Sequence, residues 1–167
     1  MNLCKNITSL FSIAAFSILA TSPAIAKTAD EIAVSTTLDN LHQAASEANG
    51  KKYFALFTDN AVFLGTDAEE RWPIADFKTY AQKRFDTGTG WTYTKVARNI
   101  TLHGDTAWFD ENLKNKYGIT RGTGVLVKQK GQWKILQYNL TMPIPNDMLE
   151  RVAGEIQAQK NKPTQNF

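Results

Sequence analysis

The sequence predicts a single α+β domain in which three N-terminal helices pack on a curved antiparallel sheet. Two observations indicate this class: apolar residues recur at helical spacing in the first half, and strand-type segments joined by tight turns fill the second half. A sheet that curves over helices leaves a cone between the two layers. The 167 residues suffice for one such domain with a substantial core, and no repeat or linker divides them.

Three helical segments are expected before the sheet. The first covers residues 30–49 and ends at the Asn49-Gly50 pair. Its apolar residues form one stripe at spacings of three and four: Val34, Leu38, Leu41, Ala45 and Ala48. A short helix over residues 51–57 follows. A third helix over 74–85 begins after Pro73, because proline suits the first helical turn.

A short strand over residues 61–64 separates the second helix from the third. Four longer strands then form an antiparallel meander, over residues 90–103, 106–117, 121–129 and 132–144. The Gly104-Asp105 and Lys130-Gly131 pairs supply two of its turns. A short helix over residues 146–159 and a polar tail complete the chain.

Residues 1–26 have the pattern of a cleaved secretory signal peptide. Lys5 precedes an apolar run, and Ala24-Ile25-Ala26 forms a small-residue cleavage site. A membrane anchor is the alternative, but the run is short for a bilayer span. We therefore expect a periplasmic or secreted protein whose folded domain covers residues 27–146, followed by a short helix and polar tail over 147–167.

The composition of the mature chain excludes several classes of function. Cleavage removes Cys4, the single cysteine, and with it disulfide and thiol chemistry. Loss of Lys5 leaves 18 Lys and Arg against 16 Asp and Glu, a balance too mild to indicate nucleic-acid binding. His42 and His103 stand alone, so their spacing predicts no metal site, and we expect no cofactor.

Two stretches carry a resemblance to a known superfamily. Residues 53–65, YFALFTDNAVFLG, and residues 122–141, GTGVLVKQKGQWKILQYNLT, are similar to the second-helix turn and the last hairpin of nuclear transport factor 2-like, or SnoaL-like, domains. The resemblance implies a cone-shaped, cystatin-like fold, a pocket inside the cone and a homodimer formed by the outer sheet face. It leaves the reaction open, because this superfamily includes isomerases, dehydratases, cyclases and non-catalytic binding domains.

The chain departs from the catalytic pattern of the superfamily's isomerases. Gly65 stands about where their general-base aspartate belongs, and Leu41 falls near their tyrosine position. Asn139 occupies a position that is histidine in many relatives, and an amide cannot exchange protons near neutral pH. The catalytic set of those enzymes therefore does not transfer to this chain.

The loop GTDAEERW, residues 65–72, is a candidate pocket rim. It carries three carboxylates, of which Asp67 is the best placed to reach a ligand, and it ends on Trp72. Carboxylates in such a loop can also serve only to cap the turn and meet solvent. The loop is more consistent with shaping a rim than with catalysis.

The segment AWFDE, residues 107–111, supplies the candidate catalytic acids. Strand alternation puts Asp110 and Glu111 on opposite faces, so one of them enters the cone whichever face lines it. A charge there needs a partner, and Arg121 on the next strand is a candidate. The alternative is an exposed cross-strand ion pair.

The last strand and the start of the second one supply further candidate ligand-binding residues. Alternation from Trp133 and Ile135 directs Gln137 and Asn139 into the cone, where the two amides can either bind a ligand or form a buried polar pair with each other. Trp91 and Tyr93 can add an aromatic wall, unless they serve the core or a dimer interface.

Three functions follow as hypotheses: binding of a small, partly apolar molecule; an acid–base enzyme; and a homodimeric assembly module. The enzyme would use Asp110 or Glu111 as base, with Tyr138, Asn139 or Arg121 stabilising an oxyanion. A buried, charged carboxylate in contact with an open cavity would favour the enzyme, and an aromatic cavity without one would favour binding.

Overall fold

The computed structural model describes residues 27–160, so the predicted signal peptide and residues 161–167 lie outside the described part. Four α-helices are present: α1 (Ala29–Ser46), α2 (Gly50–Phe54), α3 (Ile74–Phe85) and α4 (Leu149–Lys160). Six strands form one sheet: β1 (Phe57–Leu64), β2 (Arg71–Pro73), β3 (Thr94–His103), β4 (Thr106–Asn115), β5 (Gly118–Gln129) and β6 (Gln132–Thr141). A short 3₁₀ turn, η1 (Asn146–Met148), precedes α4. The predicted α+β class is confirmed.

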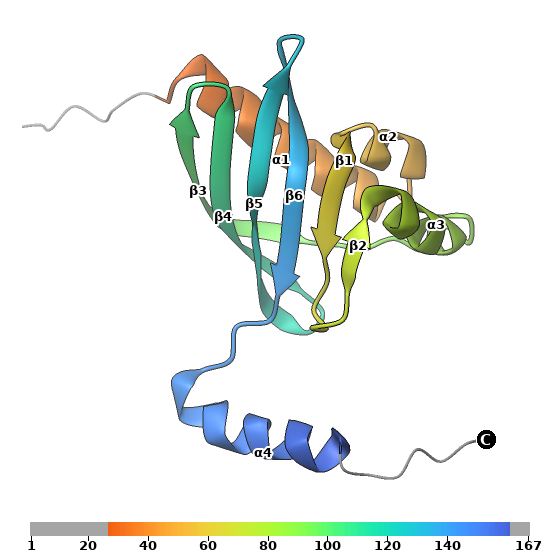
Figure 1. The fold of residues 1–167 in the computed structure, drawn as a ribbon, viewed down its shortest axis with the longest axis vertical. Coiled ribbons are helices and arrows are strands. Elements are labelled where there is room, and N and C mark those ends of the chain that lie inside the picture. Colours follow the sequence, from red (N-terminus) through yellow and green to blue (C-terminus); the bar gives the residue numbers. More distant parts are fainter. Residues whose placement is uncertain (1–26, 161–167) are drawn as a thin grey trace, which may run out of the picture.

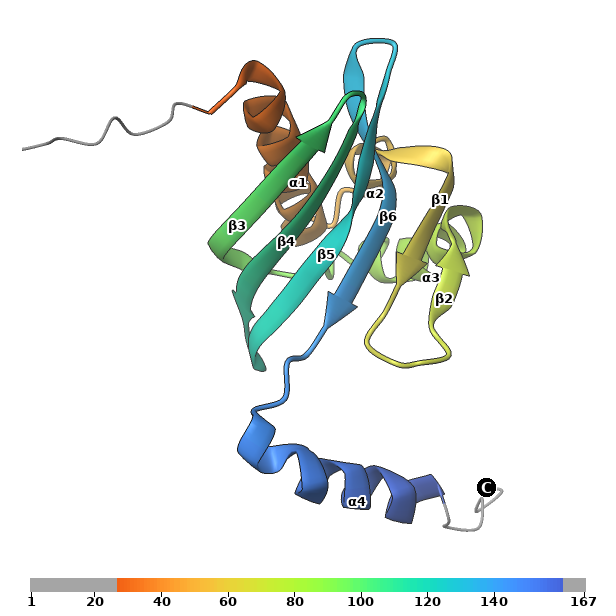
Figure 2. The same cartoon turned by 60° about the vertical axis from the view of Figure 1, so that its left-hand side comes forward.

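The sheet has the strand order β2-β1-β6-β5-β4-β3 and curves around the helices, as Figures 1 and 2 show. The pairs from β3 to β6 are antiparallel, which confirms the predicted meander. β1 pairs with β6 in parallel, a feature that the sequence analysis did not predict. The strand β2 was also missed, because three residues are too few to show alternation.

Local sequence signals explain the ends of the helices. α1 begins with a capping box: the amide of Glu31 donates to Thr28 Oγ1, and the amide of Thr28 donates to the Glu31 carboxylate. It ends where Ala48 adopts a positive φ of 53°, and the side chain of Asn49 then caps α2. Pro73 directly precedes α3, as predicted.

The core lies between the inner face of the sheet and helices α1, α2 and α3. The predicted stripe of α1 supplies buried Val34, Leu38, Leu41 and Ala45. The strands β4, β5 and β6 supply the buried residues Ala107, Phe109, Leu126, Trp133, Ile135 and Tyr138. This single layer of packing holds one face of the sheet against the helices and leaves the other face outside.

A β-bulge at Leu136 changes which side chains of β6 face inward. Leu126 of β5 is opposite Ile135, but the next pair is Val125 and Gln137, so Leu136 is an extra residue. The alternation therefore shifts by one position, and Tyr138 becomes buried in the core. The prediction that Gln137 and Asn139 enter the cone is wrong for this reason.

The helix α4 stands away from the sheet and from the other helices in both views (Figures 1 and 2). The outer face of the sheet carries Trp108, whose side chain is 47% exposed. The predicted homodimer through this face stays a prediction. Within residues 27–160, no helix has the length and apolar character needed to cross a bilayer.

Candidate functional site

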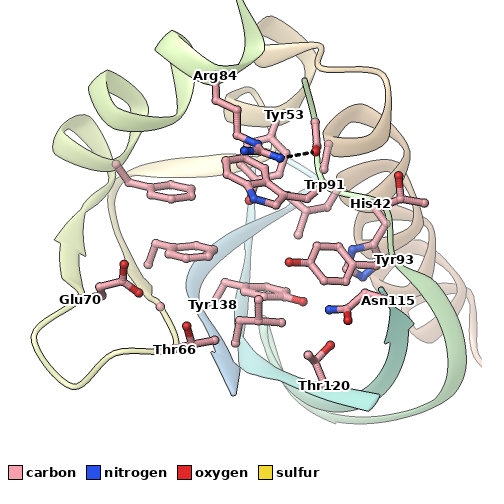
Figure 3. A pocket seen from close by; sticks show the side chains of 18 of the residues that line it. His42, Tyr53, Thr66, Glu70, Arg84, Trp91, Tyr93, Asn115, Thr120 and Tyr138 are labelled. Atoms are coloured by element: carbon pink, nitrogen blue, oxygen red, sulfur yellow. Dashed lines mark hydrogen bonds between the residues drawn. The ribbon is translucent and has the colours of Figure 1, made fainter. Parts of the chain in front are cut away.

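A pocket of about 520 Å³ opens between the inner face of the sheet and the helices α1 and α3. Figure 3 shows its side chains converging from both layers. The segment between α3 and β3 closes part of it with Trp91 and Tyr93. The backbone of this segment is fixed to α1, because the amide of Trp91 donates to the carbonyl of Ala45 at 3.1 Å.

Many aromatic side chains line the pocket: Tyr53, Phe63, Trp72, Phe77, Tyr80, Trp91, Tyr93, Tyr117 and Tyr138. The rings of Phe63 and Phe77 stack with centroids 3.9 Å apart and an angle of 3° between their planes. On its other side, Phe63 lies nearly parallel to Tyr138 at 5.8 Å. The pocket thus has an ordered aromatic wall, suited to contact with a flat apolar molecule.

A buried carboxylate lies behind this pocket. Glu111 on β4 has no exposed surface, and its Oε1 lies 2.8 Å from Nε2 of His42 on α1. The hydroxyl of Tyr138 donates to the same Oε1 at 3.1 Å. Both partners line the pocket, whereas Glu111 itself does not. The carboxylate is therefore separated from the pocket by His42 and Tyr138, and it bonds to both.

Arg98 on β3 balances the charge of Glu111. Its Nε donates to Glu111 Oε2 at 2.8 Å, and its Nη2 lies 2.6 Å from the same oxygen without hydrogen-bond geometry. The Nη1 atom donates to the carbonyl and hydroxyl of Ser35 and to Asp39. The guanidinium is thus fixed between the sheet and α1, and Glu111 has the ionic partner that a buried carboxylate requires.

These contacts decide the ionisation of the buried groups. Burial acts to raise the pKa of Glu111, but the hydrogen bond from His42 and the guanidinium of Arg98 outweigh it, and the pKa lies below its usual range. Burial raises the pKa of Tyr138, and the charge of Glu111 raises it further. Burial also raises the pKa of Tyr93. Glu111 is therefore ionised near neutral pH, while the two tyrosines stay neutral.

The mouth of the pocket carries charges of both signs. Arg84 stacks its guanidinium 5.1 Å from the centre of the Trp91 ring and donates to the carbonyl of Gly90. Glu70 and Lys116 also line the pocket. These side chains can select among polar substituents of a ligand whose body contacts the aromatic wall.

Comparison with known proteins identifies the family. The family model described as a SnoaL-like domain matches residues 34–145, about two thirds of the chain. The chain belongs to the SnoaL-like domain family. None of the curated proteins compared matches this SnoaL-like chain in sequence.

Solved structures show the same fold at low sequence identity. A nuclear transport factor 2-like protein of unknown function from Pseudomonas putida is 14% identical, with a TM-score of 0.62 over 73% of this chain and 92% of its own. A protein described as a putative aromatic ring hydroxylase from Novosphingobium aromaticivorans is 17% identical, with a TM-score of 0.59. The match covers 70% of this chain and 90% of the hydroxylase chain. At these identities the likeness concerns the fold alone.

Four of the predicted site residues line the pocket of the SnoaL-like domain: Trp72, Trp91, Tyr93 and Tyr138. Their contact with a ligand stays a prediction. The strand alternation of residues 107–111 required either Asp110 or Glu111 to face the cone, and Glu111 is the one buried on the inner face. It does not line the pocket itself but bonds to His42, which does.

The other predicted site residues lie outside the lining. Asp110 is exposed on the outer face and accepts a hydrogen bond from Asn99, and Arg121 is also exposed. Arg121 is opposite Asn112 in the sheet, and Asn112 and Glu111 point to opposite faces because they are neighbours on one strand. Arg121 therefore cannot be the partner of Glu111. The bulge at Leu136 places Gln137 and Asn139 outside as well.

Asp67 stabilises the rim loop and does not line the pocket. Its carboxylate accepts from the amide of Glu69 at 3.0 Å, and its own amide donates to Glu70 at 3.2 Å. Glu70 faces the pocket in its place, because the loop turns back there and the Gly65 amide donates to the Glu70 carbonyl. The interpretation of the loop as a structural rim agrees with these bonds.

Sequence reasoning did not identify His42 and Arg98 as the partners of Glu111. His42 lies four residues after Leu38 on the buried stripe, a signal that pointed inward. Arg98 could be found by counting from the Gly104-Asp105 turn, because that register places it opposite Glu111. Among residues 27–160, no group of acidic, histidine or cysteine side chains could hold a metal ion.

Proposed function

We propose that this SnoaL-like domain binds a small, largely aromatic molecule inside the cone. The proposal rests on one observation: a pocket of about 520 Å³ with an aromatic wall that includes the stacked rings of Phe63 and Phe77. This volume lies within the range of about 300–1,000 Å³ typical of small-molecule sites. The polar and charged groups of the lining can then orient the ligand.

The polar groups lie at different places around the aromatic wall. His42 and Tyr138 lie on the side of Glu111, and Arg84 lies at Trp91. A ligand with a flat apolar body and a polar substituent directed at His42 fits this distribution. The two cations Arg84 and Lys116 outnumber the single carboxylate Glu70 in the lining, which favours a neutral or anionic molecule over a cation.

Native mass spectrometry of the protein purified from its host tests the proposal. We expect a population heavier than the protein alone by the mass of one small organic molecule, released on denaturation. The same spectra test the predicted export, because cleavage after Ala26 gives an intact mass that begins at Lys27.

A matched pair of substitutions tests the location of the ligand. Leu140→Trp adds a large side chain to the pocket lining, whereas Thr123→Trp adds it to the outer face of the neighbouring strand. With 4-nitroanisole as the probe in isothermal titration calorimetry, we expect binding to fall only in Leu140→Trp. Equal binding by both variants would locate the probe elsewhere and refute the proposal.

Homodimerisation is a separate proposal. The outer face of the sheet exposes Trp108, and Val125 and Val127 on β5 are half-buried beside it. Pairing of two such faces would remove apolar surface from water without covering the pocket.

A further inference from the structure

His42 lines the pocket and is held by the buried carboxylate of Glu111. Its ring packs against Tyr93 at a centroid distance of 5.8 Å and against the edge of Tyr138 at 6.4 Å. Figure 3 shows it beside Tyr93 on the side of the cavity formed by α1. The aromatic contacts and the Glu111 bond fix the orientation of the imidazole.

The tautomer of the neutral ring follows from the hydrogen bond. Glu111 is an ionised acceptor, so the Nε2 atom at 2.8 Å must carry a hydrogen. The Nδ1 atom of the neutral ring then carries the lone pair. No side-chain or backbone group among residues 27–160 bonds to Nδ1. A ligand in the pocket can therefore meet an unpaired acceptor nitrogen.

The geometry of the pair allows a proton to be added at this nitrogen. A proton on Nδ1 makes an imidazolium whose Nε2–H already bonds to the carboxylate of Glu111. The other groups that face the pair are Tyr93 from the α3–β3 segment, Tyr138 from β6 and Arg98 from β3, with Asp39 of α1 bonded to Arg98. The raised pKa values of both tyrosines keep them neutral, and Glu111 is the acid in direct contact with the ring.

We propose that His42 is the proton acceptor of this site and takes the proton from a phenol- or enol-type hydroxyl of the aromatic ligand, with Glu111 as its positioning residue. This inference rests on the proposed function, because it needs a ligand in the pocket. The O–H bond of the ligand breaks, an N–H bond forms at Nδ1, and the electron pair stays on the ligand oxygen. No oxidant, metal or further reactant takes part in this transfer.

The ligand class follows from the same contacts. The aromatic wall accepts the flat body of the molecule, and Nδ1 accepts a hydroxyl directed toward α1. The phenolate or enolate then lies beside the imidazolium, and the two opposite charges attract each other.

A spectroscopic experiment tests the transfer without knowledge of the natural substrate. The probe is 4-nitrophenol, whose neutral and ionised forms absorb at different wavelengths, in a buffer where the free probe is mostly neutral. We expect the ratio of phenolate to neutral probe to be at least about tenfold higher for the bound probe than for the free probe. Binding then lowers the pKa of the probe by about one unit or more. The ratio of the two forms is independent of affinity, so a purely structural role of His42 would leave it unchanged.

Variants assign the effect to His42 and Glu111. His42→Gln keeps a donor for Glu111 but cannot take a proton, so we expect it to bind the probe in the neutral form. Glu111→Gln removes the charge that stabilises the imidazolium, and we expect a lower phenolate fraction. His103→Gln, at the exposed end of β3, is the matched control and should behave as the wild type. Nitrogen-15 NMR of the wild-type ligand-free protein must show the hydrogen on Nε2, a readout that requires no variant.

The outcomes separate this proposal from the binding proposal. If 4-nitroanisole binds the wild type but 4-nitrophenol stays neutral when bound, or does not bind, the proton-acceptor proposal is wrong and the binding site stands. If the phenolate band persists in His42→Gln, the cations Arg84 and Lys116 stabilise the anion instead, and the proposal is also wrong. If neither probe binds, the proposed function itself fails and the inference fails with it.

Discussion

The Nε2 atom of His42 on α1 lies 2.8 Å from Oε1 of Glu111 on β4, and this contact joins the helical layer to the sheet behind the pocket. The carboxylate also accepts from Tyr138 and is paired with Arg98. One fully buried charge thus connects α1, β3, β4 and β6. The same group is expected to affect both the stability of the fold and the protonation of the pocket.

Glu111→Gln is expected to destabilise the protein by about 3–5 kcal/mol, because it leaves the guanidinium of Arg98 buried without its counter-ion. Urea unfolding followed by circular dichroism measures the change. Asp110→Asn on the exposed face of the same strand is the control, with an expected change within about 0.5 kcal/mol. Equal losses in the two variants would contradict a stabilising role for the buried pair.

The double variant Arg98→Met, Glu111→Gln checks the cause of that loss. Removing both charges avoids an unpaired buried ion, so the double variant should be more stable than Glu111→Gln alone. Additive losses would show that the charge pairing between β3 and β4 is not the source of the effect.

The stability of the domain should fall in acid in a way that depends on Glu111. Its folded-state pKa is below the unfolded value, so the folded protein binds this proton less readily than the unfolded chain. The stabilisation is therefore present above the unfolded pKa of about 4.5 and is lost as the pH falls through the folded pKa. Asp30 and Asp39 also have lowered pKa values and contribute in the same direction.

Urea midpoints measured across this acid range for the wild type and Glu111→Gln isolate the contribution of Glu111. The difference between the two proteins should shrink as the pH decreases, because the wild-type carboxylate becomes neutral like the amide. A difference that stays constant with pH would show that Glu111 does not titrate on unfolding.

Gly122→Ala is expected to disturb the Tyr138–Glu111 contact. A Cβ atom at Gly122 would lie 2.5 Å from the Tyr138 hydroxyl and 3.0 Å from Glu111, closer than side chains pack. We expect a loss of about 1–3 kcal/mol and a weaker affinity for aromatic probes. Gly154→Ala in α4 is the control, because a Cβ there meets no atom within 4 Å. An equally small effect of both substitutions would show that the site adapts without cost.

The helices and most strands could be predicted because their signals are local. The stripe from Val34 to Ala45 and the turn at Gly104-Asp105 each lie within a few residues of sequence. The bulge at Leu136 has no such signal, since neither glycine nor proline marks it and only the pairing with β5 defines it. That single residue decided whether Asn139 or Tyr138 entered the pocket.

The candidate site was predicted in part for a related reason. Aromatic residues such as Trp91 and Tyr138 were found by residue type, but the partner of Glu111 required the cross-strand register. Arg121 was chosen as the nearest arginine on the following strand, whereas Arg98 is opposite Glu111 on the preceding one. The contact between His42 and Glu111 spans 69 residues and depends on how α1 lies on the sheet.

Trp108→Lys tests the predicted homodimer. The side chain is 47% exposed on the outer face, so it costs little to replace in a monomer and much in an apolar interface. Size-exclusion chromatography with light scattering should show a dimer for the wild type and a monomer for Trp108→Lys. Ile32→Lys serves as the control and should remain dimeric, because Ile32 on α1 is a similarly exposed apolar side chain, at 54%. A wild type that is monomeric at high micromolar concentration would refute the dimer, whereas a Trp108→Lys variant that remains dimeric would place the interface on another surface.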